Sequence, residues 1–424
     1  MTASSAPATR EFTPYNVYAL TLICGGFFLS YADRQILGVL LTPIKSEFQL
    51  SDTVLGLVSG LGFGVFYSLL SLPLARFADH GNRKNLLAVC IGLWSAATAL
   101  CGTAGSALHL LVARMFVAVG EAGGTPTSIS MISDLFSKSR GVAIACYNAA
   151  GSLGGAAVAV LGAWVASEYG WRSAFVVVGA PGILLGMLLL LTLREPDRGT
   201  QGTSMSDAES TRPGSFQSVG MILGNPALVF CILGGAASSA VIAMTTWLPS
   251  FLQRSHGLSL AEAGGALGVG MLIAGPFGEL AGGLLNDRLG KRSPAAVLQA
   301  VAVVSLVTIP VGLAMLLVSS VGMAMTFLVI WRLLATVFVP PTWALSQALV
   351  RPDQRATSQA LTGMAGNLLG YGCGPAVTGW LSELLRPFYG NDSLRWAIVA
   401  SLTLFGLAAA LVYARAARNL RRMN

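Results

Sequence analysis

NVYALTLICGGFFLSYADRQIL, residues 16–37, is the stretch on which the interpretation of the whole chain depends. It is almost entirely apolar up to Ala32, and then Asp33 and Arg34 stand side by side before the apolar run resumes. A helix needs about 20 residues to cross the hydrocarbon core of a membrane, so Asp33 should lie inside the span, past its midpoint and in its outer half. Ionisable groups at such depth face other helices and usually mark a transport pathway. The sequence therefore predicts a membrane helix that carries a functional ion pair.

The composition of the chain is that of a membrane protein. Of its 424 residues, 54% are hydrophobic and only 10% are charged, with a mean hydropathy of +0.69, whereas a soluble domain carries about 25% charged residues. The apolar runs predict an all-α polytopic membrane protein with twelve transmembrane helices. The expected spans are residues 16–37, 53–75, 85–105, 107–130, 141–165, 173–193, 226–251, 261–285, 294–317, 320–345, 356–382 and 394–414.

A single long polar stretch divides these spans into two sets of six. Residues 194–225 contain REPDRGTQGTSMSDAESTRPGS, which has the Gly, Ser and Pro content of a flexible linker. The other connections are short. We therefore expect an N-terminal six-helix bundle at residues 1–193, a cytoplasmic linker at residues 194–225 and a C-terminal six-helix bundle at residues 226–424.

The distribution of positive charge predicts the orientation in the membrane. With the N-terminus inside, 18 of the 26 Lys and Arg residues fall in cytoplasmic segments, five fall in outer loops and three lie inside spans. This bias follows the positive-inside rule and places both termini and the linker in the cytoplasm. It also accounts for the net charge of +8 without a nucleic-acid partner. The basic end of the chain has a second interpretation, as a contact for anionic lipids.

Three features recur in the same order in both sets of six spans. The segment ARFADHGNRK (75–84) aligns with GLLNDRLGKR (283–292), so that Asp79 matches Asp287. Farther along, Arg114 in span four corresponds to Arg332 in span ten. Asn148 in span five corresponds to Asn367 in span eleven. Two pseudo-symmetric six-helix halves, with the binding site at their interface near the midplane, are typical of a secondary transporter that works by alternating access.

The segment 283–292 resembles the signature loop of the major facilitator superfamily, G-x-x-x-D-R-x-G-K/R-K/R, without a mismatch. The first copy departs from it at Ala75, His80 and Asn82 but keeps the acid and both terminal cations. The resemblance implies the major facilitator fold and a gating role for this loop, in which exposed ion pairs worth about 0–1 kcal/mol can break in every cycle. The alternative for its cations is a plain topology signal. The gating residues implied are Asp79, Arg83, Lys84, Asp287, Arg288, Lys291 and Arg292.

Within that superfamily the N-terminal half is similar to the Spinster family. The similarity rests on Tyr31-Ala32-Asp33-Arg34, Gly120-Glu121-Ala122, Asp134-Leu135-Phe136 and Trp171-Arg172. It implies a bacterial member of a family that moves sphingolipids and lysophospholipids, with proton coupling proposed for some members. Sugar-acid and organic-anion symporters of the superfamily carry a similar stretch in span one, so a proton-coupled symporter of a small organic anion is the alternative.

Asp33, Arg34 and Glu121 are the candidate proton-coupling residues. Glu121 follows Arg114 by seven positions on span four, so two helical turns separate them and they share one face. Burial raises the pKa of a carboxyl group and a nearby Arg lowers it, so a carboxylate whose Arg partner moves can bind and release a proton. Two alternatives remain: Arg34 could bind a substrate phosphate or carboxylate, or the network could be static and structural.

The C-terminal half carries fewer charges inside its spans. Glu279 in span eight could pair with Arg332, and the remaining lining is expected to be apolar and aromatic. Such a cavity, charged on one side and apolar on the other, suits an amphipathic substrate, although aromatic residues at helical spacing more often serve packing. The candidate substrate and cavity residues are Tyr31, Arg114, Trp247, Glu279, Arg332, Phe338 and Asn367.

Other functional classes are not supported by the motifs. The sequence has no GxxxxGK[ST] for nucleotide binding and no HExxH, and its three histidines are scattered. We expect no enzymatic activity, no metal site and no cofactor other than protons as the coupling ion. The expected partners are a lipid or small amphipathic substrate and the membrane itself, and the chain is expected to act as a monomer. Short loops favour a bacterial inner membrane.

Overall fold

The computed structural model describes residues 12–196, 215–351 and 354–423, which form helices and no strands. The predicted all-α membrane architecture is confirmed. Each of the first six spans consists of one helix, except the second, in which α2 runs through a short π-helical segment into α3. Their bounds are α1 (Pro14–Phe48), α2 (Asp52–Gly56), η1 (Leu57–Leu61), α3 (Gly62–His80), α4 (Arg83–Cys101), α5 (Ala107–Leu135), α6 (Arg140–Tyr169) and α7 (Trp171–Thr192).

The second set of spans is more often interrupted. Its elements are α8 (Ser215–Leu223), α9 (Pro226–Ala243), η4 (Met244–Trp247), α10 (Leu248–His256), α11 (Leu260–Gly290), α12 (Pro294–Leu317), α13 (Val321–Thr336), α14 (Val339–Ala348), α15 (Arg355–Ala365), η6 (Gly366–Gly372), α16 (Cys373–Tyr389), η7 (Gly390–Asp392) and α17 (Ser393–Met423). By length and hydropathy the described residues give eleven membrane-length runs, because residues 357–422 count as one. The turn Gly390–Asp392 divides that run into the eleventh and twelfth spans.

Capping side chains explain why the loops are so short. Thr13 accepts a hydrogen bond from the Asn16 N–H (3.1 Å) at the start of α1, and Asn82 does the same for Asn85 (2.8 Å) at the start of α4. Ser259 and Glu262 form a reciprocal capping box at the start of α11. Each cap satisfies backbone donors that would otherwise lack partners at a helix start, so a few residues suffice to reverse the chain.

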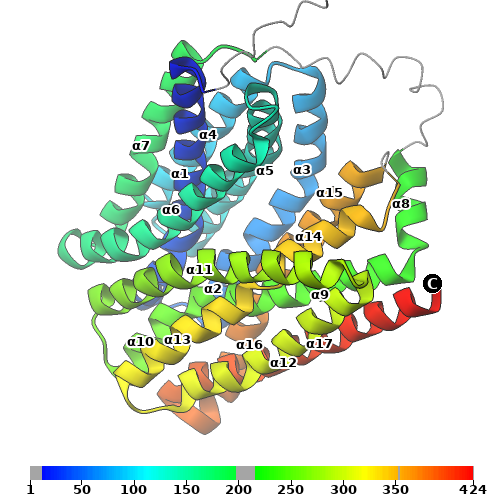
Figure 1. Ribbon diagram of the computed structural model, residues 1–424. Coiled ribbons are helices and arrows are strands. Elements are labelled where there is room, and N and C mark those ends of the chain that lie inside the picture. The colour runs from blue at the N-terminus through cyan, green and yellow to red at the C-terminus, as the bar shows by residue number, and fades with distance from the viewer. Residues whose placement is uncertain (1–11, 197–214, 352–353, 424) are drawn as a thin grey trace, which may run out of the picture.

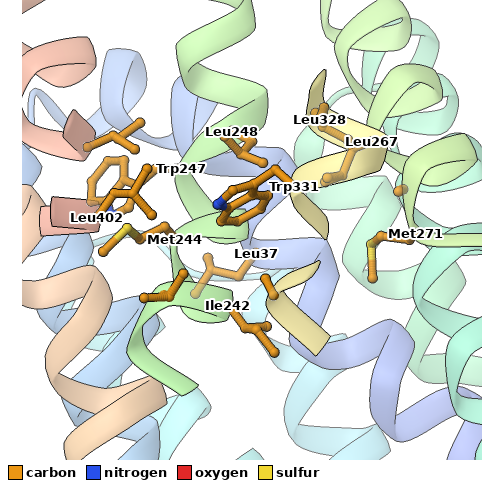
Figure 2. Packing of buried hydrophobic residues seen from close by; sticks show 14 of the residues in the cluster. Leu37, Ile242, Met244, Trp247, Leu248, Leu267, Met271, Leu328, Trp331 and Leu402 are labelled. Atoms are coloured by element: carbon orange, nitrogen blue, oxygen red, sulfur yellow. The ribbon is translucent and has the colours of Figure 1, made fainter. Parts of the chain in front are cut away.

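The two sets of helices are inclined to each other in Figure 1. Helices α1, α3, α4 and α7 stand roughly upright in that view and α6 runs obliquely in front of them, whereas α9, α11 and α17 run across it. We call the end of the bundle that carries Thr13, Leu193 and Gly224 the linker end, and the opposite end, which carries Asp52, the distal end. One buried hydrophobic cluster runs through the C-terminal set and joins it to the first set toward the distal end, where it includes Leu37 and Leu55 from the first set and Trp247 from the second. Figure 2 shows part of this shared core.

The second and eleventh spans approach each other backbone to backbone. Gly56, Gly60 and Gly64 each face a main-chain carbonyl of the segment from Asn367 to Pro375. A side chain on Gly60 would collide with the carbonyl oxygen of Gly372. Small residues are the usual means of close helix approach in membranes. Because η1 and η6 are both π-helical and lie at this seam, the widened turns coincide with the contact between the two halves.

A second seam joins α6 to α11. Gly264 and Gly268 of α11 lie against the main-chain oxygens of Ala159 and Ala156 of α6. These four positions lie toward the distal end, near the end of α6 and the beginning of α11. Together with the shared hydrophobic cluster, the two seams close the distal end of the bundle.

Two features differ from the sequence-based expectation. Helix α1 continues to Phe48, eleven residues beyond the expected end of the first span, so Asp33 lies near the middle of the helix. Pro43 and the polar residues after it, Lys45 to Glu47, concealed this extension. In addition, Ser215–Leu223 is helical although it belongs to the expected linker, since Ile222 is buried against Leu228. Residues 197–214, the greater part of that linker, lie outside the described residues.

Candidate functional site

The central polar site is built around a buried ion pair between α1 and α5. The Arg34 Nε atom lies 2.6 Å from Oε2 of Glu121, and the Ser30 hydroxyl donates to the same oxygen at 3.0 Å. The side chain of Glu121 is 0% exposed, whereas that of Arg34 is 24% exposed. Ser30 and Arg34 are one turn apart on α1, so both reach the same carboxylate. Two of the three expected proton-coupling residues are therefore in direct contact.

Aromatic rings hold the guanidinium of Arg34 on its other sides. Its Cζ atom lies 5.0 Å from the ring centre of Tyr67, 5.1 Å from that of Phe63 and 5.9 Å from that of Tyr31. Arginine side chains are attracted to aromatic faces at such distances. Of the three guanidinium nitrogens of Arg34, only Nε donates to a carboxylate among the described residues. The terminal nitrogens remain available to an anion that enters from solvent.

Asp33 and Arg114 form a second, fully buried group behind this pair. Nη1 of Arg114 donates to the main-chain oxygen of Asp33 at 3.1 Å, and its Cζ atom lies 5.4 Å from the ring centre of Phe63. Thr98 of α4 lies beside the Asp33 carboxyl. Asp33 Oδ1 and Arg114 Nε have no hydrogen-bond partner among the described residues. Asp33 is thus near the ion pair without belonging to it.

The polar groups of the C-terminal set face the same region. Tyr31 is close enough to interact electrostatically with Arg34, Glu279, Arg332 and Tyr371. Nη1 of Arg332 donates to the Thr245 hydroxyl at 3.0 Å, and within the residues described it forms no ion pair with Glu279. The expected pairing of Glu279 with Arg332 is therefore not seen, although the two still interact electrostatically.

Several side chains in the middle of the bundle are partly exposed, among them Arg34 at 24%. Tyr371 is 39% exposed and so is Trp343, whose position on α14 is nearer the linker end. The distal end is closed by the seams described above. The seams thus lie between the distal end and the partly exposed Arg34.

Three other expected cavity residues lie elsewhere or contribute little. Trp247 is 0% exposed, and its indole donates to the carbonyl of Pro375 (3.1 Å). Figure 2 shows Trp247 among the packed side chains of the shared core. The expectation that it lines the cavity is wrong for this conformation, because its side chain packs inside the shared hydrophobic cluster. Phe338 lines a small cavity inside the C-terminal set. Asn367 donates to Gly363 O at 3.0 Å and is half-buried in η6.

The two signature loops are in different environments. Arg83 is buried and donates to Ser130 Oγ (3.1 Å), to the carboxylates of Asp134 and Glu195, and to the Pro196 carbonyl (2.8 Å). The Lys84 N–H donates to Glu195 as well, at 2.8 Å. The first loop thus ties α4 to the end of α5 and to the chain that follows α7.

The second loop is exposed. Asp287, Arg288, Lys291 and Arg292 are all on the surface at the linker end and form no ion pair with any residue in the described ranges. Only the backbone of Asp79 is described, so the contacts of its side chain lie outside the described structure. The loop that matches the signature better is therefore the one without ion pairs, and the gating role of both loops stays a prediction.

Arg83→Ala should lower the stability of the N-terminal set. The change removes a buried guanidinium and leaves Asp134 and Glu195 without their shared cation, so a loss of about 2 kcal/mol is expected. The measurement is the thermal unfolding midpoint in detergent. Lys291→Ala is the matched control, because Lys291 holds the corresponding position in the exposed loop. Equal midpoints for the two variants would contradict the structural role of Arg83.

A group at the distal end was not anticipated from the sequence. The Asp52 carboxylate, at the start of α2, accepts hydrogen bonds from Lys45 (2.6 Å), from both terminal nitrogens of Arg254 (2.8 and 2.9 Å) and from Ser382 (2.7 Å). Its own N–H donates to Glu383 at 2.7 Å. We call these five residues the distal lock. Lys45 and Asp52 belong to the N-terminal set, and the other three belong to α10 and α16 of the C-terminal set.

One signal in the sequence could have pointed to the distal lock. The outer segments hold only five Lys and Arg residues, and two of them, Lys45 and Arg254, stand beside the ends of spans. A rare charge in a region that is poor in charge requires a partner. The partners themselves come from distant segments, so their meeting depends on how the two sets of helices are docked.

The sequence model of the Major Facilitator Superfamily matches residues 23–370. An MFS-type efflux pump of Mycolicibacterium smegmatis is 33% identical over 396 residues, which cover 93% of this chain and 91% of the pump. A probable galactarate/D-glucarate transporter of Bacillus subtilis is 29% identical over 321 residues, 68% of each chain.

A solved structure is similar over almost the whole chain. It is that of a bacterial homolog of the human lysosomal transporter Spinster in an inward-facing and unoccupied conformation. The TM-score is 0.84 with 30% sequence identity, and the match covers 97% of this chain and 98% of the other.

Proposed function

Because this chain belongs to the Major Facilitator Superfamily as a Spinster-like transporter and not an enzyme, we propose that it is a proton-coupled carrier of an amphipathic, lipid-like substrate. The observation that carries the proposal is the Arg34–Glu121 pair: a carboxylate without solvent exposure, held by a guanidinium that is 24% exposed and binds the carboxylate through Nε only. A phosphate headgroup of a sphingolipid or lysophospholipid fits such a guanidinium.

The proposed coupling works through competition for Arg34. A headgroup anion that binds the guanidinium weakens its contact with Glu121, and a buried carboxylate that loses its cation binds a proton more readily. Anion and proton therefore bind together and cross in one step of alternating access. The apolar part of the substrate would lie against the aromatic side of the site, where Tyr371 and Trp343 are exposed.

The orientation and the division into halves belong to the same proposal. The positive charge at the linker end supports a cytoplasmic location for it, so that the conformation described here faces inward with its distal end closed. We further propose that the carrier works as a monomer in a bacterial inner membrane, with the six-helix bundles of residues 1–193 and 226–424 rocking about the central site.

Uptake into proteoliposomes tests this function. Labelled lysophosphatidylglycerol is offered with and without an imposed pH gradient, and the expected result is uptake that the gradient stimulates. Glu121→Gln should bind the lipid and lose the stimulation, since the amide is neutral at every working pH and can neither take up nor release a proton. Glu262→Gln is the control, because Glu262 is an exposed acid in the capping box of α11. Uptake indifferent to pH in the unaltered protein would refute proton coupling.

A small organic anion is the second candidate substrate. Two arginines, Arg34 and Arg332, face the same region from opposite sets of helices, and paired arginines suit a dicarboxylate. The similarity to a galactarate/D-glucarate transporter points the same way. Labelled D-glucarate is therefore measured in the same proteoliposomes. Gradient-driven uptake of glucarate without uptake of the lipid would select this candidate.

A further inference from the structure

A small cavity lies beside Glu121, and Arg34 is not among the residues that line it. It has a volume of about 10 Å³ and is lined by Ser30, Trp94, Glu121, Gly124, Thr125, Ser128 and Tyr147, with three apolar neighbours. Two polar atoms in this lining, Oε1 of Glu121 and Nε1 of Trp94, are buried and have no hydrogen-bond partner in the described structure. One of them is an acceptor and the other is a donor. Buried polar atoms of this kind are almost always satisfied, by protein or by water.

The size and chemistry of the cavity fit one water molecule. A water needs about 10–15 Å³ and two to four polar partners. Here it would accept a hydrogen bond from the Trp94 indole and donate one to the free oxygen of Glu121. Both unsatisfied atoms would then be paired by a single molecule. The carboxylate would be bound at both oxygens, with Arg34 and Ser30 at Oε2 and the water at Oε1.

The lining continues toward the linker end through hydroxyl groups. Ser128 lies seven residues after Glu121 on α5, on the same face of the helix. The hydroxyl of Tyr147 on α6 lies beside those of Ser128 and Thr125. Hydroxyl groups both donate and accept, so a row of them can pass a proton on. The row leads away from Glu121 without crossing the guanidinium of Arg34.

We propose that this cavity binds a water molecule that connects Glu121 to the hydroxyl row, so that Glu121 exchanges its proton behind Arg34 and not through the substrate cavity. The inference rests on the proposed proton coupling and adds a separate route for the proton. Arg34 binds Glu121 on the side of the substrate cavity, and the Glu121 side chain is 0% exposed. A separate route through the water and the hydroxyl row would allow the proton to reach Glu121 independently of the anion that binds Arg34. Trp94 is a positioning residue in this scheme, because it acts through the water.

Infrared spectroscopy of the protonated carboxyl group tests the route without any transport assay. The Glu121 band is identified in the full-length protein by its loss in Glu121→Gln, and its hydrogen–deuterium exchange is followed after a change to D₂O. Trp94→Phe removes the indole donor, and the exchange is expected to slow by about tenfold. Ser128→Ala removes a hydroxyl from the row and should slow it too, which covers the case that Trp94→Phe folds poorly.

The chain offers a matched control in the other set of helices. Trp331 is also buried with an unpaired indole N–H among the described residues, but it lies on α13 away from this cavity. Trp331→Phe should leave the exchange rate unchanged. A Glu121 band whose exchange is equally fast in Trp94→Phe, Ser128→Ala and the unaltered protein would overturn the proton route and leave the proposed coupling in place. The lack of any protonated Glu121 band between pH 4 and pH 9 would overturn both.

Discussion

Asp52→Ala is expected to shift the conformational equilibrium of the carrier about 150-fold toward the state that is open at the distal end. The substitution removes the acceptor of four hydrogen bonds and leaves Lys45 and Arg254 facing each other without their shared carboxylate. Removing one partner of a buried ion pair costs about 3–5 kcal/mol. The lower figure corresponds to about 150-fold in an equilibrium constant. Because the hydrogen bonds from Arg254 and Ser382 join the two sets of helices, the closed state bears most of the cost.

The shift can be measured as a distance. Spin labels attached through Ser46→Cys on α1 and Phe388→Cys on α16, in a background with Cys146→Ser, report the separation of the two sets at the distal end. The distribution should move to longer distances in Asp52→Ala. Glu47→Ala is the control, because Glu47 binds Trp171 and Arg172 of its own set only. An unchanged distribution in Asp52→Ala would mean that the distal lock does not hold this end closed.

Gly60→Ala is expected to reduce transport by at least about 100-fold. The added methyl group would overlap the main-chain oxygen of Gly372, and neither backbone can move aside without separating the second and eleventh spans. Overpacking of this kind typically costs about 1–3 kcal/mol in a well-packed core. Here the colliding atom is a carbonyl oxygen in a helix of the other half. A carrier that cannot close its distal end cannot complete the cycle.

Folding should survive this change, since the close approach at Gly60 is between the two sets of helices and not within either. Gly275→Ala serves as the control, because a Cβ atom at Gly275 meets open space. Transport is measured in proteoliposomes, and the thermal midpoint in detergent shows whether the protein remains folded. Normal transport by Gly60→Ala would show that the seam at Gly60 is not required in the closed state.

The sequence predicted the architecture well because hydropathy and charge bias report directly on a bilayer. It also predicted that Arg34 and Glu121 belong to one site, since charges inside spans are rare and must find each other. It failed for Trp247, whose aromatic side chain carries no sign of which way it faces. Packing in the shared distal core decides that direction, and this packing exists only once both sets of helices are docked.

The distal lock could not be predicted from the sequence for a related reason. Asp52 and Ser382 are 330 positions apart, and neither belongs to a recognisable motif. Local patterns also misjudged the extent of α1, because Pro43 and Lys45 resemble the end of a span. In the signature loops, similarity to the motif did not indicate which copy forms ion pairs. The copy that matches better is exposed, whereas Arg83 of the less similar copy binds Asp134 and Glu195.

The arrangement of charges in the distal lock determines the distance over which its two sides attract each other. When the two sets separate, Lys45 leaves with Asp52, to which it is bound at 2.6 Å, while Arg254 and Glu383 remain together on the other set. Each side of the parted lock then carries one positive and one negative charge. Two such electroneutral surfaces interact as dipoles, whose attraction fades much faster with distance than that of opposite net charges. The lock therefore holds firmly in contact yet exerts little pull once open, so that substrate binding and not long-range charge attraction can decide when the distal end closes again.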